Sequence, residues 1–157
     1  MRDKKLIAEH RGGELGKDHH RLLMKWAVLC AEHVLPLFGE VIDERLINAL
    51  SVAKEWANEN TSAGRAIKAS LGAHAAAREA ASPISVAVAR SVGQAVATAH
   101  MADHSIGAAI YALKAVKIAG QSVDAERKWQ NEHLPSETKE MVLALRAAKE
   151  GSEHKQA

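Results

Sequence analysis

The stretch V-A-T-A-H-M-A-D-H-S-I-G at residues 96–107 carries the side chains best suited to chemistry, which are His100, Asp103 and His104. Residues three and four apart share one face of a helix, so a helix through this stretch would bring two imidazoles and a carboxylate together. Such a set can bind a metal ion if a neighbouring segment adds a ligand, and His74 or Glu79 would be the donor. The first interpretation is therefore a metal site.

The second interpretation is a polar cluster that fixes the core of a helical protein. The residues around the two histidines are small and apolar, which predicts burial of His100 and His104. A buried imidazole without a hydrogen-bond partner costs about 1 to 3 kcal/mol, so we expect both to be paired with Asp103, Arg78 or His74. We favour this interpretation because H-x-x-x-H is common in helices by chance. The candidate site is thus His74, Arg78, His100, Asp103 and His104.

No other pattern in the sequence indicates a reaction. The phosphate-binding G-x-x-x-x-G-K-[ST], the dinucleotide-binding G-x-G-x-x-G, the zinc-protease H-E-x-x-H and the hydrolase G-x-S-x-G are all missing. We expect a protein that is not an enzyme and has no cofactor. The alternative is a small metal-binding helical-bundle protein or enzyme that uses His100, Asp103 and His104. We expect His20 and His154 to face solvent.

The composition favours one helical domain in a reducing compartment. A chain of 157 residues suits a single domain, and with 3% aromatic residues its core must consist of Ala, Leu, Ile and Val. The net charge of +2 comes from interleaved acids and bases, which argues against a nucleic-acid partner. Cys30, the single cysteine, excludes an internal disulfide. The charged start and the absence of a long uncharged run predict a cytoplasmic protein with no membrane contact.

Apolar periodicity predicts an all-α, single-domain bundle of about seven helices in residues 1–157. We expect an ordered core at about 15–149 and a frayed tail at 150–157. The expected helices are 18–38 capped by Asp18, 43–58 capped by Asp43, 63–81 capped by Thr61 or Ser62, 82–119, 122–132 capped by Ser122, and a last one capped by Ser136. The segment 82–119 is either two helices or one helix kinked near residue 102.

The periodicity also predicts which side chains face the core. In the first helix the expected buried stripe is Leu22, Trp26, Leu29, Cys30, His33 and Leu37. In the third helix it is Ile67, Leu71, His74 and Arg78. We expect all three tryptophans, Trp26, Trp56 and Trp129, to be core residues. Alanine-rich faces that remain exposed would favour a homodimer.

Three blocks of the sequence resemble the immunity-protein-five-like family over about residues 18–135. The first is W-A-V-L-C-A, with matches at Trp26, Ala27, Cys30 and Ala31. The second is A-H-A-A-A-R at 73–78, and the third and most specific is A-T-A-H-M-A-D-H at 97–104. The family is assigned to bacterial polymorphic toxin systems, a kind of toxin-antitoxin system.

The resemblance implies a function and shows one departure. Members of this family are thought to protect a cell from a toxin made by itself or its kin, so the implied activity is protein binding and the implied partner is a cognate toxin protein. The family often has Asp-x-Arg-Pro-Arg before its second long helix. This chain keeps Asp43 and Arg45 but continues with Leu46 and Ile47, so a basic cluster is missing there.

Overall fold

The computed structural model describes residues 4–156, with the side chains of His10 and residues 151–156 left out of the description. Within this part the chain forms seven α-helices and no strand, which confirms a single all-α domain. The helices are α1 (Lys17–Val34), α2 (Glu44–Ala57), α3 (Ala63–Glu79), α4 (Pro83–Ala97), α5 (His104–Ile118), α6 (Val123–Glu132) and α7 (Lys139–Gln156). Short 3-10 turns occupy Lys4–Leu6, Glu9–Arg11 and Leu35–Phe38. None of the helices in residues 4–156 is long and apolar enough to cross a membrane.

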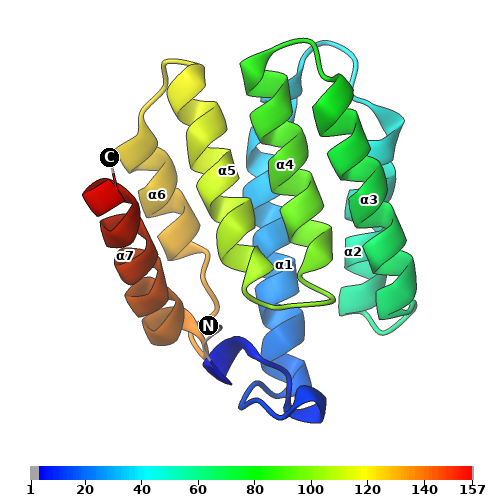
Figure 1. Cartoon of the computed structure of the whole chain (residues 1–157), viewed down its shortest axis with the longest axis vertical. Coiled ribbons are helices and arrows are strands. Elements are labelled where there is room, and N and C mark those ends of the chain that lie inside the picture. Colours follow the sequence, from blue (N-terminus) through cyan, green and yellow to red (C-terminus); the bar gives the residue numbers. More distant parts are fainter. Residues whose placement is uncertain (1–3, 157) are drawn as a thin grey trace.

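The helices form two layers. Figure 1 shows α3, α4 and α5 side by side, with α1 and α2 behind them and with α6 and α7 beyond α5. The tightest neighbours are α4 with α5 and α3 with α4, and α1 touches α2, α4 and α5. One face of the α3–α5 layer therefore packs on α1 and α2, and its other face is the outside of the bundle.

Short polar side chains begin four of the helices as expected. The side chains of Asp43, Ser62, Ser82 and Ser122 each accept a hydrogen bond from a backbone N–H two or three residues later. The prediction that Asp18 caps the first helix is wrong, because α1 begins one residue earlier, after Gly16. Asp18 lies in the first turn of α1 and pairs with Arg21 at 3.0 Å.

Helix α1 is buried on a broad face because it touches three other helices. Trp26 is fully buried, as expected, and its Nε1 donates to the carbonyl oxygen of Gln130 at 2.8 Å. Trp56 and Trp129 are only half-buried. The narrow stripe predicted for this helix is partly wrong, since Leu29 is 41% exposed and His33 is exposed. The helix ends at Val34, and residues 35–38 tighten into a 3-10 turn that contains Pro36.

The predicted buried stripe of the third helix is wrong. Ile67 is 38% exposed and Leu71 is 66% exposed. The buried face of α3 instead consists of small residues, which are Ala66, Ala69, Ser70, Ala73, Ala76 and Ala77. Small residues let α3 approach α4 closely, and the valines of α4 supply the apolar volume. These alanines are buried inside the bundle and are not available to a second copy of the chain. The homodimer therefore stays a prediction, which sedimentation equilibrium would test.

The segment 82–119 forms two separate helices. Helix α4 ends at Ala97 and α5 begins at His104, and the backbone N–H groups of residues 98–100 bond three residues back instead of four. The carbonyl oxygen of Thr98 would accept from residue 102 in a continuous helix, but here it accepts from His20 Nε2 at 2.6 Å. Because of this break, His100, Asp103 and His104 do not share a helix face, and the ridge predicted through them is wrong.

The two ends of the chain extend the expected core. Leu6 is buried in the same apolar cluster as Leu15 and Trp26, so the core begins before residue 15. Helix α7 runs to Gln156. The fraying expected for residues 150–157 stays a prediction, and Ala157 and the side chain of His154 lie outside the described residues.

Candidate functional site

A row of polar side chains crosses the outer face of the α3–α5 layer. Arg90 Nη1 on α4 donates to His74 Nδ1 on α3 at 2.7 Å. One turn further along α4, Gln94 Oε1 accepts a hydrogen bond from His104 Nδ1 on α5 at 2.7 Å. We name these four residues, His74, Arg90, Gln94 and His104, the polar row. It links the three helices of the layer by hydrogen bonds.

Two glycines let these side chains lie against the helix backbones. A Cβ atom added to Gly93 would lie 2.7 Å from the His74 ring, and one added to Gly107 would lie 2.7 Å from Gln94 Oε1. Contacts that short do not occur for real Cβ atoms, so an alanine at either position would push the polar side chain outward. The glycines therefore hold the row close to the surface of the layer.

His74 is held in its neutral form. Partial burial is the largest cause that lowers its pKa, and the charges of Arg90 and Arg78 add to it, with a further contribution from His104. A neutral imidazole has one nitrogen without a proton, and this is the nitrogen that accepts from Arg90. The positive charge of this face therefore comes from its arginines and lysines.

The structure brings together only part of the predicted site. His74 and His104 belong to the polar row, and Arg78 is exposed one turn beyond His74 on α3. His100 lies apart, with its Nδ1 3.4 Å from Arg11 Nη2. His104 contacts Gln94 and His100 contacts Arg11, two partners that the sequence did not indicate. The expected pairing of these histidines with Asp103, Arg78 or His74 stays a prediction.

Asp103 has a different position from the one expected. It is the residue before α5, and its side chain makes no capping hydrogen bond there. In the part of the chain that the structure describes, no three His, Cys, Asp or Glu side chains are grouped so that they could hold a metal ion. The metal-binding alternative thus has no supporting geometry among these residues.

A pocket lies beside His20, and no pattern in the sequence indicated it. This histidine was expected to face solvent, but it is only 6% exposed. Its ring packs edge-on against Trp56, with the ring centres 4.8 Å apart, and it donates to Thr98 as described above. His20 is buried because the turn after α4 offers a carbonyl oxygen to it, and no local pattern around residue 20 indicates this.

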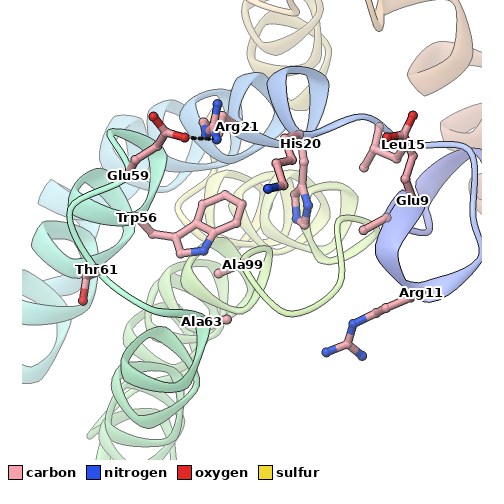
Figure 2. Close-up of a pocket in the computed structure, with 12 residues that line it drawn as sticks. Glu9, Arg11, Leu15, His20, Arg21, Trp56, Glu59, Thr61, Ala63 and Ala99 are labelled. Carbon is pink, nitrogen blue, oxygen red and sulfur yellow. Dashed lines mark hydrogen bonds and ion pairs between the residues drawn. The ribbon is translucent and has the colours of Figure 1, made fainter.

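The pocket has a volume of about 400 Å³ and lies where the N-terminal segment meets the ends of three helices. Figure 2 shows it with His20 and Arg21 from the start of α1 on one side and Trp56 and Glu59 from the end of α2 on another. Arg21 forms an ion pair with Glu59 there. Ala99 also lines the pocket, so the A-T-A-H-M-A-D-H block contributes to both the pocket and the polar row.

Leu46 and Ile47, which depart from the family pattern, have opposite environments. Leu46 is fully buried, whereas Ile47 is exposed on α2. Arg45, the basic residue that is kept, pairs with Asp43 at 2.8 Å and with Glu79 at 2.5 Å. The charge of Arg45 is therefore neutralised by two carboxylates.

By its structure this protein is an all-α domain with a polar outer face. Comparison with known proteins gives its family. A family model described as "Imm-5 like putative immunity protein" matches residues 13–137, which is most of the chain. The chain belongs to this family. No curated protein matches the chain, and no solved structure matches it.

Proposed function

We propose that this protein is an immunity protein that binds a cognate bacterial toxin domain stoichiometrically in the cytoplasm and blocks its activity. The observation that carries the proposal is the family match over residues 13–137. That range includes the helices α1 to α6, the polar row and the part of the pocket lining that lies beyond residue 13. A protein that acts by binding needs a preformed surface, and the outer face of the α3–α5 layer supplies one.

The charge of this layer supports an acidic partner. Residues 63–118 contain six Lys or Arg and only two Asp or Glu, a formal charge of +4, against +2 for the whole chain. The rest of the chain therefore has a charge of −2. Helices α4 and α5 contain no Asp or Glu at all. Complementary charge favours association and selects the correct partner.

Exposed apolar and basic side chains lie together on α3. Lys68 and Arg78 are exposed, and among the described residues neither pairs with a carboxylate. Ile67 and Leu71 are the exposed apolar residues of the same helix. Apolar anchors surrounded by charged groups are typical of protein interfaces. We therefore propose that the toxin docks on this face with an acidic surface.

Bacterial growth tests the proposal. A toxin domain found encoded next to this gene would be expressed with and without this chain, and we expect the chain to restore growth. The double variant Lys68→Glu/Arg78→Glu should lose protection. The matched control Lys25→Glu/Lys139→Glu, which changes the net charge equally at exposed positions on α1 and α7, should keep it. A folded wild-type chain that gives no protection would overturn the proposal.

A further inference from the structure

The pocket beside His20 has a mainly apolar interior. Its apolar lining residues are Ala8, Leu15, Trp56, Ala63 and Ala99. Its volume of about 400 Å³ is within the range of small-molecule sites. The pocket could therefore hold a short apolar chain, and its polar groups decide which end group that chain carries.

Trp56 offers an unused hydrogen-bond donor to the pocket. The Nε1 of the buried Trp26 donates to a backbone carbonyl oxygen, whereas among the described residues Trp56 Nε1 has no acceptor. Trp56 is half-buried and lines the pocket. A ligand that covers the half-buried ring would remove its N–H from water, so such a ligand should carry an acceptor oxygen for it.

The charges around the pocket favour an anionic acceptor. Three cations line it, Arg11, Lys17 and Arg21, against two carboxylates, Glu9 and Glu59. Arg21 is already paired with Glu59 and with Asp18.

Arg11 and Lys17 are the cations that remain for a ligand. Arg11 contacts the His100 imidazole at 3.4 Å, and neither Arg11 nor Lys17 forms an ion pair with a carboxylate among the described residues. Figure 2 shows Arg11, His20 and Trp56 around the same opening.

We propose that this pocket binds a carboxylate that is attached to a short apolar chain. The apolar chain packs against Trp56, and the carboxylate accepts from Trp56 Nε1 and pairs with the Arg11 guanidinium. Either a free small carboxylic acid or the carboxyl end of a partner protein has this chemistry. The site is separate from the α3 face, so its test does not depend on the toxin.

Nuclear magnetic resonance of the ¹⁵N-labelled full chain tests the pocket directly. The indole N–H signal of Trp56 is assigned with Trp56→Phe, and the signal of Trp26 serves as an internal reference. The probes are hexanoate and its neutral control hexanamide, and an acetylated Ala-Ala-Leu peptide with a free carboxylate and the same peptide as an amide. We expect an acid to shift the Trp56 signal saturably, at concentrations on the order of millimolar, while its amide does not.

The two acids distinguish the sources of the carboxylate. A shift by hexanoate alone assigns the site to a free small acid, and a shift by the peptide acid alone assigns it to a protein terminus. If both acids shift the signal, the carboxylate and a short chain suffice. No shift with either acid, or equal shifts with acids and amides, would overturn the proposal.

A charge variant checks the role of Arg11. Arg11→Gln should weaken binding of the effective acid about tenfold, because it removes the ionic part of the contact. Lys4→Gln, which removes an exposed charge elsewhere in the N-terminal segment, should bind as wild type does. An unchanged Trp26 signal and unchanged circular dichroism would show that both variants fold. Equal binding by wild type and Arg11→Gln would contradict the assigned role.

Discussion

The imidazole of His74 lies against Gly93, across the contact between α3 and α4, so closely that a Cβ atom on Gly93 would be 2.7 Å from the ring. Arg90, three residues before this glycine, donates to the same ring. The contact between His74 and Gly93 therefore sets both the spacing of α3 and α4 and the position of the polar row.

Replacing Gly93 by alanine should destabilise the protein. Overpacking costs about 1 to 3 kcal/mol, and the higher helix propensity of alanine offsets about 1 kcal/mol of that. The net cost is up to about 2 kcal/mol, so we expect Gly93→Ala to lower the melting temperature by up to about 8 °C, measured by circular dichroism. Gly107→Ala is the comparison variant: its Cβ would displace the flexible end of Gln94, and the higher helix propensity of alanine offsets the loss of about 1 kcal/mol of hydrogen bonding, so it should melt near wild type. A higher melting temperature for Gly93→Ala would contradict this packing.

The lowered pKa of His74 predicts a dependence of stability on pH. Below about pH 6.5 the unfolded chain binds a proton at His74 that the folded chain takes up only at lower pH. The unfolded state then binds more protons, so the free energy of unfolding decreases as the pH falls from 7.5 to 5. His74→Gln should show a smaller decrease, measured as the shift in urea midpoint, because it lacks this imidazole. Identical shifts would show that His74 is not held neutral.

Cys30 should be chemically inert in the folded protein. It is fully buried, and burial is the largest cause that raises its pKa far above the ordinary value of a thiol. The thiolate, which is the reactive form, is therefore scarce at pH 8. We expect an aromatic disulfide reagent to label Cys30 only after unfolding in urea. Rapid stoichiometric labelling without urea would contradict the burial of this side chain.

The two histidines of the A-T-A-H-M-A-D-H block should differ in their effect on stability. His104→Ala removes the hydrogen bond to Gln94 inside the polar row, which should cost about 1 kcal/mol and lower the melting temperature by several degrees. His100→Ala removes a longer contact to the exposed Arg11 and should have a smaller effect. The opposite order in thermal melts would mean that His100 is the more important residue.

Local rules predicted the helices well, because a cap or a proline acts within a few residues. Asp43 and Ser82 begin helices where a short polar side chain can bond a free N–H, and this depends on nothing distant. The stripe of α3 failed for the opposite reason. Its burial depends on which neighbour packs on it, and close packing against α4 favoured the alanine face over Ile67 and Leu71.

The candidate site was predictable only in part. His74 and His104 were identified by residue type and by resemblance, and both lie in the polar row. The helix face predicted for His100, Asp103 and His104 was wrong because the chain leaves the helix after Ala97, where Thr98 bonds His20, 78 residues away in sequence. The pocket could not be predicted from local patterns because three stretches far apart in the sequence, 8–21, 56–63 and Ala99, build it.

The affinity of the chain for its toxin tests the central claim most directly. A catalytically inactive form of the toxin domain against which the chain protects would be titrated by isothermal calorimetry into wild type and the two charge-reversal variants. We expect one-to-one binding to wild type and to Lys25→Glu/Lys139→Glu, and binding at least about tenfold weaker to Lys68→Glu/Arg78→Glu. Absence of binding to the folded wild-type chain would contradict the proposed function, and equal affinity for all three proteins would contradict the proposed docking face.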